Sequence, residues 1–106
     1  MNPAIVLLLA VTATQGDSGS FVISNFRFAS GETLPELRLH YRTLGRPRRD
    51  AAGVVRNAVL ILHGTGGAGG QFLSPVFAAE LYGAGQPLDT ATHYLILPDN
   101  IGHGRS

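Results

Sequence analysis

Two kinds of apolar pattern divide the first half of the chain into strands. Phe21–Phe28 is rich in aromatic and β-branched residues, and apolar and polar residues alternate throughout Glu36–Arg42. Alternation with a period of two is typical of a strand that buries one face. Turn-forming residues, 29–32, separate the two runs. The pattern predicts an antiparallel hairpin in which the leucines and tyrosine of the second run face the core, whereas its charged residues and His40 face solvent.

Two apolar runs without alternation follow the hairpin. Ala58–Leu62 is continuous, and Tyr94–Leu97 is a second run of the same kind. Short continuous runs with β-branched residues predict parallel strands that are buried on both faces. The polar stretch Gly45–Asn57 before the first run is expected to be an exposed loop.

One short helix is predicted between these two strands. Ser74 and Pro75 have the form of an N-cap followed by proline at the first helical position, and Gly83 is a suitable stop. The order hairpin, strand, helix, strand predicts an α/β fold entered through an antiparallel edge. The residues expected on the buried side of the helix are Leu73, Val76, Phe77 and Leu81.

Composition excludes several classes of function. The chain has 106 residues, of which 44% are hydrophobic and 14% charged, as expected for one small globular unit. A net charge of +1 gives no nucleic-acid footprint. All eight basic residues are arginine, which excludes a Walker-type phosphate loop, since that loop needs lysine. Cysteine is absent and no pair of histidines or carboxylates has metal-ligand spacing, so we expect neither thiol chemistry, nor a metal, nor a cofactor.

The first twenty residues are expected to precede the fold. Ala4–Ala13 is an apolar decapeptide that is too short to span a bilayer. It fits the apolar region of a secretory signal, with Val11 and Ala13 at the −3 and −1 positions of a cleavage site. A frayed apolar terminus or a wrongly assigned start codon is the alternative. Thr14–Ser20 is then a polar spacer, the fold occupies residues 21–106, and the expected location is secreted or periplasmic, otherwise cytoplasmic.

A glycine-rich loop links the first buried strand to the helix. It reads Gly64-Thr65-Gly66-Gly67-Ala68-Gly69 and follows His63. Open α/β sheets bind their ligands at the carboxyl ends of parallel strands, and exposed backbone N–H groups there can hold an anion. The anion is either the phosphate of a nucleotide or the oxyanion of an acyl-transfer intermediate.

The nucleotide alternative rests on the match of residues 64–69 to G-x-G-x-x-G. A dinucleotide site needs the third glycine inside the opening helix and an acidic residue about twenty residues further on. Here the helix signal begins five residues after Gly69, and Asp99 lies thirty residues after it. The spacing therefore favours the oxyanion, and a nucleotide-binding domain stays as an alternative.

The remaining polar candidates are expected to be structural. A histidine at the end of a buried strand, such as His63, more often fixes a loop by hydrogen bonding than acts as a base, and His103 is interpreted in the same way. His93 is expected at the surface. Gly104-Arg105-Ser106 has the beginning of a nucleophile elbow, but six residues separate it from the preceding strand. Ser106 is therefore expected to cap a following helix.

Two segments of the chain resemble the α/β-hydrolase superfamily. Val59–Gly67 resembles its third strand and oxyanion loop, and Asp99–Ser106 resembles its D-x-x-G-H-G-x-S segment after the next strand. More narrowly, Leu37–Gly45, Asn57–Leu60 and Pro87–Thr90 are similar to the homoserine O-acetyltransferase-like branch. The loop itself departs from the H-x-L-T-G of the true acetyltransferases.

The resemblance implies that Phe21–Ser106 is the N-terminal part of an α/β-hydrolase fold. It implies an ester or acyl hydrolase, or an O-acyltransferase, with a serine nucleophile and a small ester or acyl substrate. The nucleophile, acid and catalytic histidine of the family have no matching positions here, so the 106 residues alone are expected to be inactive. A non-catalytic interaction module is the alternative, and the oligomeric state is open.

The resemblance also implies roles for residues of the glycine-rich loop. One donor of the oxyanion hole in this fold comes from the loop after the third strand. By motif position this donor is the backbone N–H of Thr65, with Gly66 as the alternative. Gly64 and Gly67 are then expected to lie against the substrate, where the absence of a Cβ permits close approach.

Overall fold

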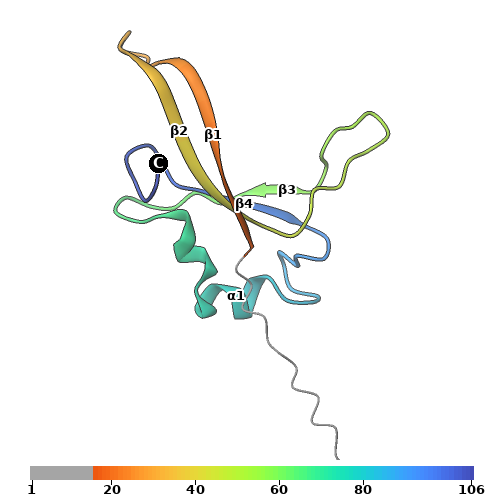
Figure 1. Ribbon diagram of the computed structural model, residues 1–106. Coiled ribbons are helices and arrows are strands. Elements are labelled where there is room, and N and C mark those ends of the chain that lie inside the picture. Colours follow the sequence, from red (N-terminus) through yellow and green to blue (C-terminus); the bar gives the residue numbers. More distant parts are fainter. Residues whose placement is uncertain (1–15) are drawn as a thin grey trace, which may run out of the picture.

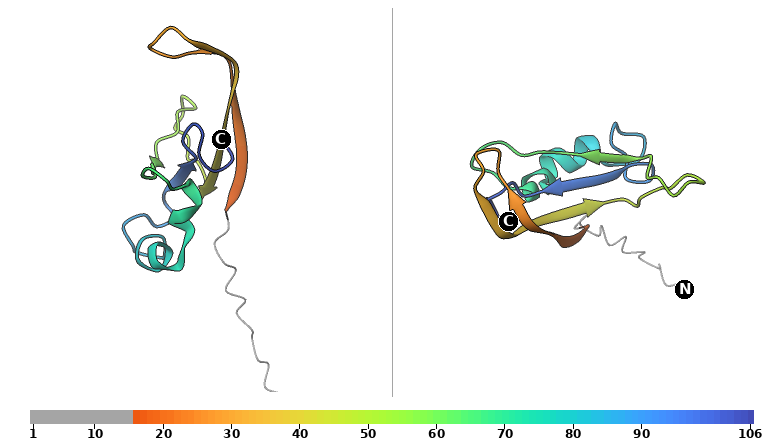
Figure 2. Two further views of the ribbon diagram at one scale, coloured as in Figure 1. Left: turned by 90° about the vertical axis from the view of Figure 1, so that its left-hand side faces the viewer. Right: turned by 90° about the horizontal axis from the view of Figure 1, so that it is seen from above.

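The described part of the chain is one mixed sheet with a short helix on one face (Figures 1 and 2). The computed structural model describes residues 16–106. Its elements are β1 (Asp17–Arg27), β2 (Thr33–Leu44), β3 (Ala58–Leu60), the 3₁₀ helix η1 (Gly69–Leu73), α1 (Pro75–Leu81) and β4 (Tyr94–Pro98). The four strands are ordered β1-β2-β4-β3, and β3 and β4 are parallel, whereas β2 is antiparallel to β1 and β4. The predicted hairpin and β-α-β unit are confirmed.

The N-terminal predictions fall partly outside the described residues. The candidate signal segment, Ala4–Ala13, lies there entirely. Within residues 16–106, neither helix has the length and apolar character needed to cross a bilayer. β1 begins at Asp17, which pairs with Thr43. Residues 17–20, predicted as spacer, therefore belong to the sheet, because β2 extends far enough to satisfy their backbone groups.

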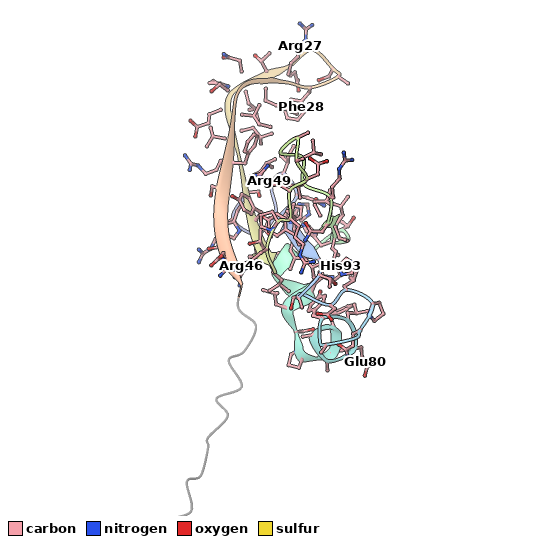
Figure 3. All side chains as sticks on the ribbon, turned by 90° about the vertical axis from the view of Figure 1, so that its right-hand side faces the viewer. Arg27, Phe28, Arg46, Arg49, Glu80 and His93 are labelled. Carbon is pink, nitrogen blue, oxygen red and sulfur yellow. The ribbon has the colours of Figure 1, made fainter. Side chains whose placement is uncertain are left out.

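The β1–β2 hairpin projects beyond the sheet and bends near its tip (Figure 2). Asn25 has φ 54°, a left-handed conformation that asparagine tolerates better than most residues. Asn25 lies between the pairs Ser24–Glu36 and Phe26–Leu34, so the residue opposite it on β2 is Pro35. Proline has no N–H to donate to the ladder at this position. Arg27 and Phe28 lie at the tip in Figure 3, where Phe28 packs edge-on against Phe26 at 4.9 Å between ring centroids.

β2 changes character along its length. In its outer half Leu37 is buried and Arg38 is exposed, as the alternation predicts. From Tyr41 onward the strand also pairs with β4, and here both faces are covered. His40, Thr43 and Leu44 are all buried. The surface position predicted for His40 is therefore wrong, because Asp99 and Ser106 of the segment after β4 pack on this residue.

The two parallel strands differ in burial. Leu95 and Leu97 of β4 have no solvent exposure, as predicted. β3 instead ends at Leu60, and the side chains of Leu60 and Leu62 are 59% and 61% exposed. The prediction of two buried faces is wrong for β3, because within the described residues the core packs against the face that carries Val59, and the face that carries Leu60 stays uncovered.

Helix α1 begins at Pro75, as predicted, and it packs on a small core. Ser74 precedes it without a side-chain cap hydrogen bond. The core is formed by Leu44, Tyr82 and Leu95, with Val59, Leu73, Ala78, Leu81 and Leu88 packed against it. Val76 and Phe77 are 77% and 37% exposed, so their predicted burial is wrong. The helix turns Ala78 and Leu81 toward the core, and Val76, two residues before Ala78, lies on the opposite side.

Candidate functional site

The candidate site lies at the sheet edge where β3 and β4 both end. Because the strands are parallel, the segments that follow them, residues 61–68 and 99–106, emerge on the same side. Figure 1 shows these two segments next to each other, and hydrogen bonds join them. We call Gly64–Gly69 the glycine loop.

His63 ties the beginning of the glycine loop to the segment after β4. The imidazole is buried, its Nδ1 lies 2.8 Å from the Gly64 carbonyl oxygen, and its Nε2 accepts a 2.9 Å hydrogen bond from the Asn100 amide. These partners require the neutral tautomer with the proton on Nδ1. The structural role predicted for His63 is thus confirmed. His103 is also structural, with Nδ1 3.1 Å from the Ile101 carbonyl oxygen and its ring 5.3 Å from that of His63.

The first four residues of the glycine loop form a tight turn. The Gly67 amide donates to the Gly64 carbonyl at 3.1 Å, and Gly66 has φ 82°. A left-handed third residue is the geometry of a type II turn and favours glycine. A Cβ on Gly66 would meet no atom within 4 Å. The glycine is therefore needed there for its backbone conformation and not for space within the described residues.

Two amides of this turn are unoccupied. Thr65 and Gly66 are exposed, and among residues 16–106 neither backbone N–H donates a hydrogen bond. The Gly67 amide, by contrast, is used inside the turn. The loop therefore presents two adjacent donors to solvent at the carboxyl ends of the parallel strands.

Asp99 ties the end of the glycine loop to β2 and to the chain beyond β4. The residue is 5% exposed. One carboxylate oxygen accepts from the Gly69 amide at 2.8 Å, and the other accepts from the Arg105 amide at 3.0 Å and lies 3.1 Å from His40 Nδ1. Burial disfavours the charged carboxylate, but these donors outweigh it and hold the pKa of Asp99 below its usual value.

Gly69 is pressed against the end of β4. A Cβ there would lie 2.5 Å from the Leu97 carbonyl oxygen and 2.9 Å from that of Pro98. Close packing on β4 therefore explains this glycine. The Asp99 carboxylate, which the nucleotide alternative needs for a ribose, is buried and bonded to the chain itself.

Ser106 is held by main-chain groups. Its hydroxyl donates to the Asp99 carbonyl at 2.7 Å and accepts from the His40 amide at 2.9 Å. Among residues 16–106, no hydrogen bond joins this hydroxyl to an imidazole. The arrangement fastens the segment after β4 to β2 and does not resemble an activated nucleophile, for which an adjacent base is needed.

We also searched the described residues for other ligand sites. A hollow of about 780 Å³ opens at the amino end of β4, opposite the loop. It is lined by Asp17, Thr43, Gly45, Arg46, Pro47, Arg48, Thr90, Ala91 and Tyr94. In the described part of the chain, no three acidic or histidine side chains gather in a way that would hold a metal ion. The carboxyl edge therefore remains the candidate site.

The sequence did not reveal the partnership of His40 with Asp99. The signal was slight: an imidazole on the polar face of an alternating strand, and an aspartate directly after a buried strand. Neither shows that the two residues, 59 positions apart, lie in contact.

Comparisons with known proteins agree with this geometry. Over 47 residues, 44% of the chain, it is 47% identical to a probable acyltransferase of Methanothermobacter thermautotrophicus. Over 89 residues, 76% of the chain, it is 34% identical to a homoserine O-acetyltransferase of Leifsonia xyli. The chain spans 15% and 21% of these two proteins.

A solved structure shares the fold. The crystal structure of a mutant esterase matches 78% of this chain with a TM-score of 0.61, at 20% sequence identity, and the match covers 23% of the esterase. A scan against known family descriptions gives no match. With the strand order, the glycine loop and the segment after β4, these similarities show that the chain has the fold of the N-terminal part of an α/β-hydrolase and is similar to the homoserine O-acetyltransferase-like branch.

Proposed function

We propose that the protein carrying this chain transfers acyl groups through a serine nucleophile, either to water or to a hydroxyl acceptor. The observation that carries the proposal is the pair of unoccupied amides at Thr65 and Gly66. In this fold one donor to the oxyanion of the tetrahedral intermediate comes from the loop after the third strand, which supports the proposal. Relatives named as acyltransferases and an esterase of related fold support the same chemistry.

The proposed role of the Thr65 amide is electrostatic. When a nucleophile attacks the substrate carbonyl, the oxygen becomes negatively charged, and a donor already aimed at it stabilises the transition state more than the ground state. Loss of one such donor typically raises the barrier by about 2.7–4 kcal/mol. Gly66 is the alternative donor, and Gly64 and Gly67 are proposed to border the substrate.

The other reacting groups are proposed to lie outside this chain. In this fold the second oxyanion donor follows the nucleophile, which stands on a sharp turn between a strand and a helix. The only serine of the carboxyl edge with a described environment, Ser106, is bonded to main-chain groups. The 106 residues alone are therefore proposed to be inactive.

The proposal is tested in the full-length protein with p-nitrophenyl acetate. Gly66→Val forces a β-branched residue into a left-handed conformation and displaces the turn. We expect kcat to fall about 100-fold or more, as for removal of an oxyanion donor. Thr65→Ala is the matched control, because it keeps the backbone N–H, and its kcat should stay within about threefold of wild type. Equal rates for Gly66→Val and wild type would contradict the proposal.

We also propose export to a secreted or periplasmic location. The proposal rests on the apolar segment Ala4–Ala13 alone. Fractionation of cells expressing the full-length protein, followed by N-terminal sequencing, tests it. A mature terminus directly after Ala13 supports export, and an intact terminus in the cytoplasmic fraction refutes it.

A further inference from the structure

We infer that Asp99 is a positioning residue that holds the glycine loop in the geometry needed to bind an oxyanion. The inference rests on the proposed function, and it assigns a task to a residue that does not itself face the substrate. Its basis is the pair of hydrogen bonds that close the two ends of the loop on consecutive residues, Asp99 and Asn100.

Both ties of the loop lead to the same dipeptide. At the beginning of the loop, the Asn100 amide donates to His63 Nε2 at 2.9 Å. At its end, the Gly69 amide donates to the Asp99 carboxylate at 2.8 Å. The unoccupied amides of Thr65 and Gly66 lie between these ties. A movement of Asp99 would therefore displace the loop at both ends.

The tie at Gly69 is the more demanding of the two. The residue is buried, and its close approach to the carbonyl groups of Leu97 and Pro98 leaves no room for a side chain. Its amide therefore depends on the Asp99 carboxylate, because a buried N–H without a partner is costly. Without the carboxylate, the end of the loop has to move toward water to satisfy this amide.

The Asp99 carboxylate is in turn fixed by groups from two other segments. His40 of β2 and the Arg105 amide both bind the oxygen that does not face Gly69. Gly104 has φ 52°, and a Cβ there would collide with the same oxygen. The carboxylate is thus enclosed between β2 and the segment after β4. The orientation of the carboxylate is therefore fixed by β2 and the segment after β4, and it does not depend on the exposed loop.

Such support matters because oxyanion stabilisation depends on donors that are in place before the reaction. A displacement of about 1 Å from the reacting geometry can lower a rate about 100-fold. Two exposed amides on a turn of small residues would otherwise move freely. The hydrogen bond from Gly69 to Asp99 therefore restrains the loop, because its glycines alone leave it flexible.

Asp99→Asn in the full-length protein is the main test. The amide places a donor against the Arg105 N–H or the Gly69 N–H, so at least one of these bonds is lost. We expect kcat for p-nitrophenyl acetate to fall about 30- to 100-fold, with KM changed less than about threefold. Hydrogen–deuterium exchange should accelerate at residues 64–69 and not in the β1–β2 hairpin.

Asp89→Asn is the matched control. Asp89 also accepts two backbone hydrogen bonds, from Gly85 and Ala91, but it lies before β4, at the other end of the strand from the glycine loop. The control should leave kcat, and exchange at residues 64–69, as in wild type. Asp99→Asn with wild-type kcat, or with wild-type exchange in the loop, would overturn the inference.

The exchange measurement separates the inference from the proposed function. If the wild-type protein does not turn over acyl esters, the proposed function fails, and the exchange result alone decides whether Asp99 holds the loop. If Asp99→Asn does not fold, His40→Ala replaces it, since it removes one support of the carboxylate and keeps the others. It should accelerate exchange at residues 64–69, and His40→Asn, which retains a donor, should reverse part of that change; no acceleration would overturn the inference.

Discussion

At each end of β4 an aspartate accepts hydrogen bonds from the chain, but the partners of the two aspartates lie at very different distances along the sequence. At the amino end, Asp89 accepts hydrogen bonds from Gly85 and Ala91, which lie four and two residues away. At the carboxyl end, Asp99 accepts from Gly69 and pairs with His40, which lie 30 and 59 residues away. Asp89 therefore shapes one turn, whereas Asp99 fastens three separate parts of the fold.

The two aspartates also differ in what surrounds them. The turn at Asp89 lies beside the hollow that is lined by Arg46 and Arg48, and the bonds of Asp89 stay within the turn. The carboxyl end carries the glycine loop, whose Thr65 and Gly66 amides have no partner among residues 16–106. Unpaired donors can be held still only by bonds elsewhere, and Asp99 and His63 provide those bonds.

The largest difference in stability between the two ends of β4 is expected for glycine substitutions. Gly69→Ala places a methyl group against the backbone of Leu97 and Pro98, which cannot rotate away. We expect a loss of about 2–3 kcal/mol in the free energy of unfolding, typical of overpacking. Gly85→Ala, at the amino end, is strained by φ 75° but has open space, and should lose about 1 kcal/mol.

Urea unfolding of the full-length variants measures both losses. If Gly85→Ala proves as destabilising as Gly69→Ala, the close contact of Gly69 with β4 does not restrain the protein. Tight packing would then not distinguish the carboxyl end of β4 from the amino end.

The pH dependence of stability should show the ionised state of Asp99. Burial opposes ionisation, but the amides of Arg105 and Gly69 and the His40 ring together hold the pKa of Asp99 below its usual value. A carboxyl group with a depressed folded-state pKa contributes stability above its unfolded pKa of about 3.9. That contribution is lost as the pH falls through the folded-state pKa.

The measurement compares wild type with Asp99→Asn across pH 2 to 7. The stability difference between them should be constant near neutral pH and should shrink progressively as the pH falls below about 4. The pKa of Asp89 is also lowered, chiefly by the Gly85 and Ala91 amides, but this group is less buried than Asp99 and is more strongly screened by solvent. Asp89→Asn should therefore change the profile less; an equal change would contradict the comparison.

The sequence predicts local features of this fold better than the contacts between its elements. The strand directions, the start of α1 at Pro75 and the structural role of His63 follow from nearby residues. His40 was misplaced because its burial depends on contacts with Asp99 and Ser106, which lie far along the chain. Val76 was misplaced because the core contacts at Ala78 and Leu81 fix the rotation of α1. The task of Asp99 could not be predicted, since its partners are brought to it by the folded sheet.

The smallest predicted effect concerns Ser106, the hydroxyl of the carboxyl end. Ser106→Ala removes one hydrogen bond to the Asp99 carbonyl and leaves the His40 amide without its acceptor. We expect a loss of about 1–2 kcal/mol in stability and a kcat within about threefold of wild type in the full-length protein. Thr92→Ala, at the amino end, removes an exposed hydroxyl that donates to the Asp89 carbonyl, and should change stability by less than about 0.5 kcal/mol.

The same variant tests whether Ser106 reacts. A serine bonded to two main-chain groups has no base to take its proton, so the activity should survive its removal. The wild-type chain of 106 residues should show no turnover of p-nitrophenyl acetate. Turnover by that chain which Ser106→Ala abolishes would make Ser106 the nucleophile. The carboxyl end of β4 would then hold the reacting group itself and not only the support for the proposed oxyanion donors.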